Sequence, residues 1–429
     1  MIKILHTADL HLGKSFHEYS LIEDQAYMLN GLSALLADPS YDALVVSGDV
    51  FDRSIPSPEA VELFSGFLGT LKKSRPNLEI LIIPGNHDSP ARLAYGKELF
   101  AGLGVHIAGA AETAFDPVMI RAGADGAEIC ACFLLPFLYP GSLVPAAEGA
   151  DSSEAGANGG AADGSAANDD AAAAADRGGA RRGQAALAEE AARRLEDARK
   201  KALAKGASSS MLAAHLFCSG GKGSDSERSF LGQAEQVDPG LFAGFDYVAL
   251  GHLHRPQKAG KNAWYSGSPL AYSFDEADHQ KCFLSVEITG NPGHAGENPS
   301  TEDSRRLRVT TLPSLPLRPL RRLSGPFERF LKDQDTALKE AEQCFLEITL
   351  SGGTLTENAL PILRQRFPHL LSLRQDEARA AMTADEPRRK TGNRNALDDF
   401  REFLEEIYGG ADDGKLRCFA EILEDLEEA

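Results

Sequence analysis

Cysteine is scarce in this sequence, and none of the six cysteines belongs to a Cys-x-x-Cys pair. A chain of 429 residues can build an ordinary hydrophobic core, so neither a disulfide framework nor a thiolate zinc site is indicated. Cys130 and Cys132 stand two apart in an apolar run, so we expect both on one buried face of a strand.

Long apolar segments are also missing. No stretch approaches 18 consecutive apolar residues, the length expected of a membrane-spanning helix. His6 and Asp9 stand where a signal peptide would need an apolar run. We therefore expect a soluble, cytoplasmic protein with no membrane contact.

Positive charge is in deficit, with 44 Lys and Arg against 63 Asp and Glu, a net charge of −19. Such a balance argues at first against a nucleic-acid partner. The charge is unevenly spread, however, because residues 395–429 carry a net −9 and residues 305–332 a net +7. The basic stretch is either a solvated face or a contact for phosphates, and binding through phosphates would weaken steeply with salt.

Short runs rich in Ile, Val and Leu alternate with helical patterns and predict a βαβαβ order at the start of the chain. Strands buried on both faces require helices on either side of a mostly parallel sheet, so the fold class is α/β. The expected strands are Ile2–Leu5, Ala43–Val46, Ile80–Ile83, Val105–Ala108, Ile129–Leu135, Leu212–Phe217, Tyr247–Leu250 and Cys282–Ile288, with helices at about Leu21–Leu36 and Pro58–Lys73.

Composition divides the rest of the chain. Residues 146–182 have almost no large apolar side chains, which predicts a disordered insertion, and the pattern of Gln184–Lys205 predicts a solvated helix. Beyond a first domain at 1–290, we expect a small α/β domain at 305–375 with strands at Leu307–Leu312 and Phe345–Leu350. A polar linker at 376–394 then precedes two amphipathic helices within 395–429.

Polar clusters follow five of the predicted strands, at the sheet edge where open α/β folds bind ligands. Glycines at 48, 85 and 251 permit sharp turns there. Side chains two apart on a strand point the same way, so each Asp-x-His or His-x-His pair can converge. The candidate metal ligands are Asp9, His11, Asp49, Asn86, His215, His252 and His254.

Carboxylate, imidazole and amide ligands without thiolate favour manganese, iron or another borderline divalent ion over structural zinc. Seven ligands exceed one tetrahedral centre but suit two ions that share a carboxylate, an arrangement that clamps a phosphoryl oxygen and activates water. Any one cluster could instead consist of satisfied core polar groups, whereas all five in this order are hard to explain that way. The other histidines lack companions at ligand spacing, although His17 follows the first cluster closely.

The motif order DxH, GDxxD, GNHD, a lone His and GHxH resembles the calcineurin-like metallophosphoesterase superfamily. The wider segments are similar to the SbcD family, the nuclease subunits of bacterial SbcCD complexes. The resemblance is strong over residues 1–290 and weak beyond them. Its segments are HTADLHLGKSF, VVSGDVFD, IPGNHDS, YVALGHLHRPQ and YSGSPLAYSFDE.

The resemblance implies a four-layer metallophosphoesterase sandwich of mixed, largely parallel sheets flanked by helices. One Mn²⁺ would be held by Asp9, His11, Asp49 and His254, and a second by Asp49, Asn86, His215 and His252, with Mg²⁺ or Fe²⁺ as substitutes. His87 would donate a proton or contact the transition state, and Asp52 would orient His87.

The resemblance also implies a DNA exonuclease and endonuclease that cuts duplex ends and hairpins in DNA repair and recombination. Residues 395–429 would grip an SbcC-type coiled-coil ATPase, since about thirty residues are too few to bury both apolar stripes on each other. A homodimer within a heterotetramer is expected. Two rivals stay open: a phosphatase acting on phosphoproteins or small phosphoesters, because GDVFDR also resembles phosphatase motifs, and a scaffold of the same fold without activity.

Overall fold

The structure is a computed structural model in which two units are distinguished: Met1–Ser351 with Thr356–Gln375, and Gly352–Leu355 with Asp376–Ala429. It describes residues 1–122, 126–143, 183–221, 223, 236–290, 306–332, 336–352, 358–375, 397, 400, 401, 404 and 414–420. The predicted insertion at 146–182 and linker at 376–394 lie outside these residues. No helix in the described part is long and apolar enough to cross a membrane.

The first sheet has the strand order β14-β13-β1-β4-β5-β6. Its middle strands are parallel, and β13 and β14 add an antiparallel edge. The bounds are β1 (Ile2–Thr7), β4 (Ala43–Ser47), β5 (Glu79–Ile83), β6 (Val105–Ile107), β13 (Cys282–Ile288) and β14 (Leu307–Pro313). The βαβαβ order expected from the apolar runs is confirmed.

The second sheet has the order β11-β12-β10-β9-β8-β7, and β12, β10, β9 and β8 run parallel. Both Cys130 and Cys132 are buried on β8 in the cluster between the sheets, as the sequence predicts. The bounds are β7 (Val118–Ala122), β8 (Glu128–Leu135), β9 (Ser209–His215), β10 (Tyr247–Gly251), β11 (Gln257–Lys258) and β12 (Ala263–Tyr265).

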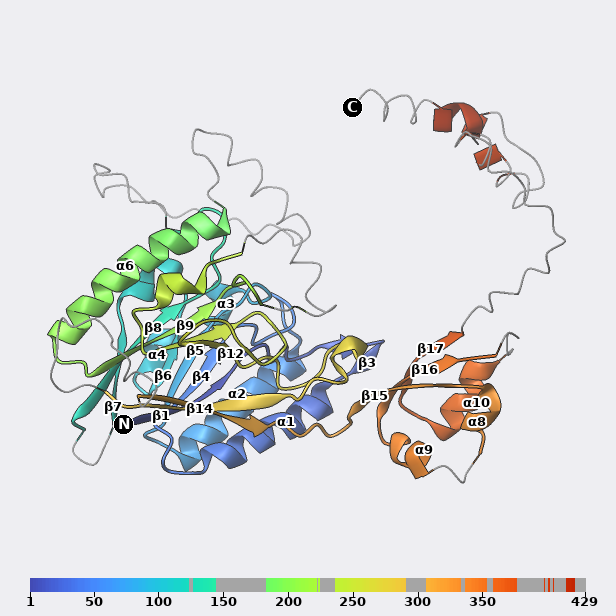
Figure 1. Cartoon of the computed structure of the whole chain (residues 1–429), viewed down its shortest axis with the longest axis horizontal. Coiled ribbons are helices and arrows are strands. Elements are labelled where there is room, and N and C mark those ends of the chain that lie inside the picture. The colour runs from blue at the N-terminus through green and yellow to red at the C-terminus, as the bar shows by residue number, and fades with distance from the viewer. Residues whose placement is uncertain are drawn as a thin grey trace. The chain divides into compact units, whose positions relative to one another are not determined.

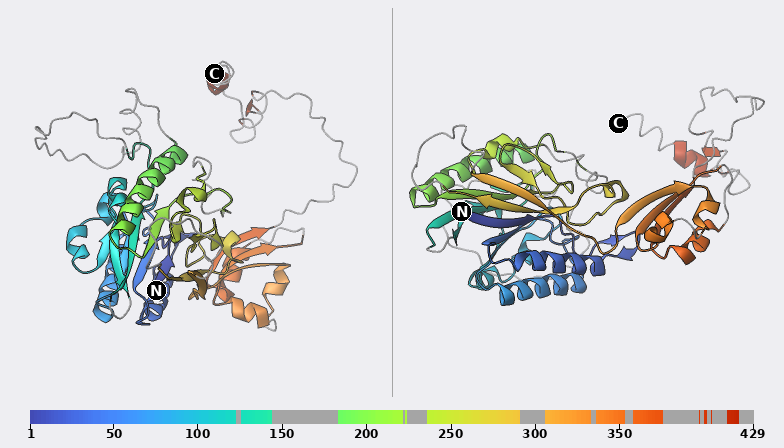
Figure 2. Two further views of the ribbon diagram at one scale, coloured as in Figure 1. Left: turned by 60° about the vertical axis from the view of Figure 1, so that its left-hand side comes forward. Right: turned by 60° about the horizontal axis from the view of Figure 1, so that its bottom comes forward.

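The two sheets pack face to face between layers of helices (Figures 1 and 2). Successive residues of β1 alternate, so that Leu5 packs in the cluster containing the α1 and α2 side chains, while Ile4 packs between the sheets. The helices on that side are α1 (Ile22–Leu36) and α2 (Pro58–Ser74), and α6 (Gln184–Ala204) covers the second sheet. This is the four-layer α/β arrangement that the resemblance implies.

Helix α6 corrects one expectation. Its bounds match the predicted helix, but it is not a solvated helix, because Leu187, Ala191 and Leu195 are buried against the second sheet. Small alanines let the helix lie close to the sheet, so few large apolar residues are needed to cover it. The small number of bulky side chains in α6 therefore reflects close packing against the sheet rather than exposure to solvent.

The small α/β domain lies within the first unit. It is a parallel three-stranded sheet in the order β15-β16-β17, with a core that includes Phe330, Leu346 and Phe367. The expectation that Leu307–Leu312 opens this domain is wrong. That segment forms β14, whose antiparallel register with β13 adds it to the first sheet. The elements are β15 (Leu320–Gly325), α8 (Phe327–Phe330), α9 (Thr336–Ala341), β16 (Phe345–Leu350), α10 (Ala359–Arg366) and β17 (Leu370–Gln375).

Short elements complete the first unit, and the described residues 397, 400, 401, 404 and 414–420 of the second unit are helical. In the second unit Phe400 and Phe419 stack with ring centroids 4.3 Å apart, and Leu404 and Leu416 are buried, so part of the apolar stripe is covered within this unit. The short elements are β2 (Ser15–Phe16), β3 (Tyr19–Ser20), α3 (Pro90–Leu93), α4 (Lys97–Ala101), η1 (Ala111–Phe115), η2 (Pro239–Phe242) and η3 (Phe274–Glu276).

Candidate metal centre

The seven predicted ligands lie at the carboxyl ends of five parallel strands, three in the first sheet and two in the second. β1, β4 and β5 lead into the first three clusters, β9 ends at His215, and β10 leads into the His-x-His pair. Because the two sheets pack face to face with these ends together, residues more than 200 positions apart meet, as shown by the contact of His11 with His254.

Four ligands gather on one side of the centre. Oδ1 of Asn86 lies 3.0 Å from Nε2 of His215 and 3.0 Å from Nδ1 of His252. Oδ2 of Asp49 lies 3.4 Å from Nε2 of His215. These imidazole nitrogens and amide and carboxylate oxygens surround one point. Borderline divalent ions prefer such a mixture of nitrogen and oxygen ligands.

The other ligands gather beside them. Nε2 of His11 lies 3.1 Å from Nε2 of His254 and 3.8 Å from Oδ2 of Asp49. Asp9 belongs to two possible ligand sets. A carboxylate oxygen of Asp9 lies within 4.8 Å of ligand atoms of His11 and His254 in one set, and of Asp49 and His215 in the other. The two imidazole nitrogens face each other at the distance of two ligands that could share a cation or of a hydrogen-bonded pair.

The backbone at the centre adopts conformations that non-glycine residues seldom take. Positive φ angles occur at Asp9 (54°), His11 (43°), Asp49 (50°) and His252 (105°). Each such residue destabilises the fold by about 1–3 kcal/mol, and strain of this kind gathers at functional sites. Four of the seven predicted ligands therefore carry backbone strain.

Burial sets the protonation of the site. The four ligand histidines and both ligand aspartates are almost fully buried. Burial lowers the pKa of His11 to about 4 and that of His252 to about 3, which leaves both imidazoles neutral, the form that binds metals, near neutral pH. Burial also raises the pKa of Asp9 to about 7. Burial alone would lower the pKa of His215, but the neighbouring Asp49 carboxylate outweighs it and raises that pKa to about 9.

His87 lies next to His11, with the two ring centroids 4.9 Å apart. Its backbone N–H donates to Oδ1 of Asp49 at 2.9 Å, and Nδ1 of its half-buried ring donates to the backbone carbonyl of Asp52 at 2.9 Å. His87 also comes within 4.8 Å of His11 and Asp52 ligand atoms. The role that the resemblance implies for His87 stays a prediction.

The expectation that Asp52 orients His87 stays a prediction. Oδ1 of Asp52 accepts from Nζ of Lys14 at 2.7 Å and lies 3.5 Å from Nδ1 of His11. The backbone carbonyl of Asp52 accepts from Nδ1 of His87. The loop after β4 turns the side chain toward the first cluster, a direction that the spacing in GDxxD cannot specify.

Two functional acids were not assigned from the sequence. Asp88 is 2% exposed, and its carboxylate accepts the backbone N–H groups of Val50, Phe51 and Gly85, which ties together the loops that carry Asp49 and Asn86. Its place in GNHD was the available signal. Glu276 is fully buried, with Oε1 3.1 Å from Nδ1 of His254, and nothing in its spacing indicated this contact.

In the part of the chain that the structure describes, the remaining histidines belong to none of the candidate metal-binding groups. His6 is buried in β1 and its Nδ1 pairs with the hydroxyl of Tyr247 at 2.8 Å. His17 is exposed and its ring lies against Phe16 and Phe274. The seven residues converge with buried imidazoles, buried carboxylates and no thiolate, a donor set that fits a divalent metal ion.

Part of the basic stretch at 305–332 pairs with acids of the same chain. Nη1 of Arg318 lies 2.7 Å from Oδ2 of Asp24, and Arg322 lies 3.4 Å from Glu347. Arg308 is exposed and lies 3.4 Å from Glu287 at the edge of the first sheet. Contact of this stretch with DNA stays a prediction.

The centre and the two packed sheets define a metal-dependent phosphoesterase. Residues 2–130 match the family described as calcineurin-like phosphoesterase, and residues 316–408 match the type 5 capsule protein repressor C-terminal domain. Two curated relatives each carry the name of the D subunit of the nuclease SbcCD. The one from Staphylococcus epidermidis is 29% identical over 380 residues, covering 87% of this chain and 85% of the relative.

The relative from Bacillus subtilis is 31% identical over 443 aligned positions, covering 100% of this chain and 99% of the relative. At this identity and coverage the chain belongs to the SbcD family of metallophosphoesterases. The family expected from the motif order is confirmed.

Proposed function

We propose that the chain is a Mn²⁺-dependent DNA exonuclease and endonuclease that hydrolyses phosphodiester bonds at duplex ends and hairpins, together with an SbcC-type ATPase. The observation that carries the chemistry is the convergence of Asp9, His11, Asp49, Asn86, His215, His252 and His254 at one buried point. The DNA substrate rests on the names of the two relatives.

In this proposal the seven ligands hold two ions. Asp9, His11, Asp49 and His254 would hold one, and Asp49, Asn86, His215 and His252 the other. When bound, such a pair polarises the phosphoryl oxygen and supplies a nucleophilic hydroxide near neutral pH. Asp49 is the proposed shared ligand because its Oδ2 faces His11 at 3.8 Å and His215 at 3.4 Å.

The side chains around the ions have separate roles in this proposal. His87 would act in its doubly protonated form: Nδ1–H donates to the Asp52 carbonyl, and Nε2–H gives its proton to the leaving oxygen, which leaves a neutral ring. The Asp88 carboxylate accepts from backbone N–H groups of the two loops that carry Asp49 and Asn86, and so holds these loops together. The buried surroundings of the ligands would strengthen each electrostatic contact with the phosphate.

Partner contacts are proposed on separate surfaces. Residues 395–429 would bind the coiled coil of the ATPase, with their acidic surface suited to a protein rather than to DNA. A second copy of the chain would cover the exposed apolar side chains of the segment around α3 and α4, where Tyr95, Leu99 and Leu103 are each more than half exposed. Such a homodimer would carry two nuclease centres, and sedimentation of the purified chain tests it.

The deciding experiment compares substrates. A labelled hairpin DNA and a phosphopeptide are incubated with the chain and Mn²⁺, with and without chelator. We expect cleavage of the hairpin, lost with chelator, and little phosphate release from the peptide. Preferential phosphate release would support the phosphatase rival instead, and no product with either substrate, together with failure to retain metal, would support a scaffold.

A further inference from the structure

The two ring nitrogens of His254 have different neighbours. Nε2 lies 3.1 Å from Nε2 of His11 and faces the proposed metal centre, whereas Nδ1 lies 3.1 Å from Oε1 of Glu276 on the opposite side of the ring. An ionised carboxylate can only accept hydrogen bonds, so Nδ1 carries the proton and Nε2 offers its lone pair to the centre. Glu276 thus selects the ring tautomer that can bind a metal.

Glu276 is itself held in place by several donors. It is fully buried in the turn η3, where Nζ of Lys281 lies 2.6 Å from Oε2. The backbone N–H of Tyr272 donates to Oε2 at 3.3 Å, and the Ser273 hydroxyl, which is shared with Asp275, lies 3.2 Å from Oε1. A buried carboxylate is tolerated when it is paired and hydrogen-bonded in this way. Its position is therefore determined independently of any metal.

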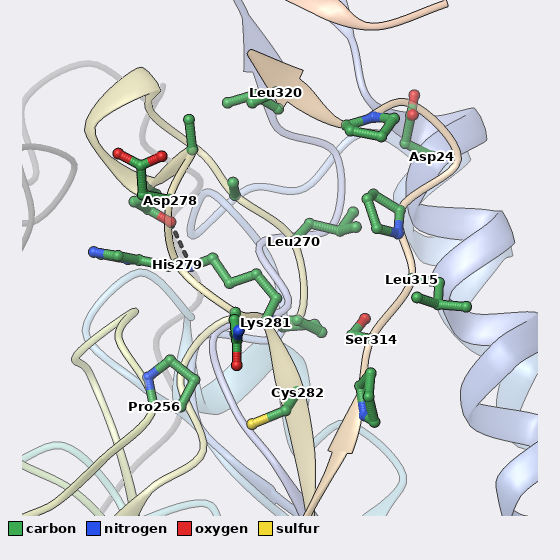
Figure 3. Close-up of a pocket in the computed structure, with 18 of the residues that line it drawn as sticks. Asp24, Pro256, Leu270, Asp278, His279, Lys281, Cys282, Ser314, Leu315 and Leu320 are labelled. Carbon is green, nitrogen blue, oxygen red and sulfur yellow. Dashed lines mark hydrogen bonds and ion pairs between the residues drawn. The ribbon is translucent and has the colours of Figure 1, made fainter. Parts of the chain in front are cut away.

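Lys281 connects this acid to the rest of the site. Its Nζ also donates to the backbone carbonyl of His254 at 2.9 Å and to the Ser268 hydroxyl at 2.8 Å. The backbone carbonyl of Lys281 accepts from the N–H of Ser314 at 2.9 Å, next to the end of β14. Lys281 and Ser314 line a cavity of about 840 Å³ (Figure 3). Lys281 thus fixes both the acid and the loop that carries His254.

The other ligand histidines, all of which the structure describes, are held differently. Nδ1 of His215 donates to the backbone carbonyl of Ser47 at 2.9 Å. Nδ1 of His11 lies 3.5 Å from Asp52, too long for a strong hydrogen bond, and Nδ1 of His252 faces Asn86 within the centre. Among the four, His254 has the shortest contact between an outward nitrogen and a carboxylate, 3.1 Å to Glu276 against 3.5 Å from His11 to Asp52.

We propose that Glu276, held by Lys281, is a positioning residue for His254 that sets the affinity of one of the two ion sites. This inference rests on the proposed function, because it takes His254 as a metal ligand. A carboxylate behind a ligating imidazole fixes the ring and raises its basicity. The site of Asp9, His11, Asp49 and His254 therefore depends on Glu276, and the site of Asp49, Asn86, His215 and His252 does not.

The test titrates the full-length chain with Mn²⁺ and measures free Mn²⁺ by electron paramagnetic resonance. We expect two ions per wild-type chain, and in Glu276→Gln and Glu276→Ala a loss of about 10- to 100-fold in affinity for one ion with the other unchanged. Lys281→Met should act in the same direction, since it leaves Glu276 in place without its lysine partner. Excess Mn²⁺ should restore the turnover rate of Glu276→Gln, which a merely misfolded variant could not recover.

The matched control is Glu347→Gln. Glu347 is also a buried carboxylate, paired with Arg322 and Arg374 at 3.4 and 3.1 Å, but it lies in β16 of the small α/β domain. This variant should bind both ions as the wild type does. Folded Glu276 variants with wild-type titrations, or an equal loss in Glu347→Gln, would overturn the inference. A wild-type chain that binds no Mn²⁺ would instead contradict the proposed function.

Discussion

A methyl group added at Gly48 would lie 2.1 Å from Nδ1 of His215, and the residue has a φ of +93°, which L side chains rarely adopt. The close approach lets Ser47 offer its carbonyl to the same nitrogen at 2.9 Å. Gly251 is equally confined, because a Cβ there would lie 1.8 Å from the carbonyl oxygen of Ser47. Glycine at these two positions permits the two sheets to bring their ligands together.

We therefore expect Gly48→Ala to displace His215 and to reduce both bound Mn²⁺ and nuclease activity. The matched change is Gly66→Ala in α2, where nothing lies within 4 Å of the added Cβ, and alanine should stabilise the helix by about 0.5–1 kcal/mol. Metal content and thermal unfolding of the two variants check this. Normal metal binding by Gly48→Ala would show that the ring can move without loss.

His87 should act in the chemical step rather than in metal binding. His87→Gln is expected to retain about two ions per chain and to lose about 10²- to 10⁴-fold in single-turnover rate, the usual contribution of a positioned general acid. The backbone N–H of residue 87, which donates to Asp49, is unchanged by the substitution. Elemental analysis alongside cleavage measures both quantities.

A His87→Gln variant that loses its ions would make His87 a ligand, and one that cleaves at the wild-type rate would remove it from the reaction. Asp52→Asn provides the comparison. Because the Asp52 carboxylate contacts Lys14 and His11, this variant should need more Mn²⁺ rather than imitate His87→Gln.

Among individual residues, the sequence predicts the polar side chains that come directly after strands, because Asp9 and His252 follow the ends of β1 and β10 by one or two residues. It does not predict Glu276 or the direction of the Asp52 side chain. Those contacts depend on how loops fold over the sheet edge, and hydrophobic periodicity carries no information about loop direction.

Helix α6 is the element whose environment differs most from expectation. Leu195 is fully buried among the side chains of the second sheet, whereas Arg193 is exposed and pairs with Glu190 on the same helix. Burial of the helix face, rather than its charged pairs, holds α6 in place.

We expect Leu195→Ala to lower the free energy of unfolding by about 2–5 kcal/mol, the usual effect of truncating a buried leucine. Arg193→Ala should change it by less than about 1 kcal/mol, as exposed ion pairs do. Urea unfolding of both variants decides between a packed and a solvated helix. Equal, small effects would favour the solvated helix.

The strands of the first sheet could be predicted because parallel strands buried on both faces read as continuous apolar runs. The membership of β14 could not, since its alternating exposure suits any edge strand, and only the register with β13 places it in the first sheet. The bounds of α6 were predictable from composition, but its packing was not, because alanine is compatible with both exposure and close contact.

On the scale of the whole molecule, the residues of the proposed metal centre and those of the proposed ATPase contact belong to different units. The seven ligands lie between Asp9 and His254, and residues 395–429 belong to the second unit. We therefore expect a chain ending before Asn395 to keep Mn²⁺-dependent cleavage of DNA and to lose association with an SbcC-type partner. Co-purification with the partner measures this, and wild-type recovery of the truncated chain would contradict it.

The central claim is that DNA cleavage and metal binding depend on the same shared carboxylate. The most direct measurement determines bound Mn²⁺ and cleavage of a labelled hairpin on the same samples of wild type and Asp49→Asn. We predict about two ions and cleavage for the wild type, and loss of both together in Asp49→Asn, because Oδ2 of Asp49 faces both ligand groups. A folded Asp49→Asn chain that still cleaves the hairpin at the wild-type rate would contradict this account.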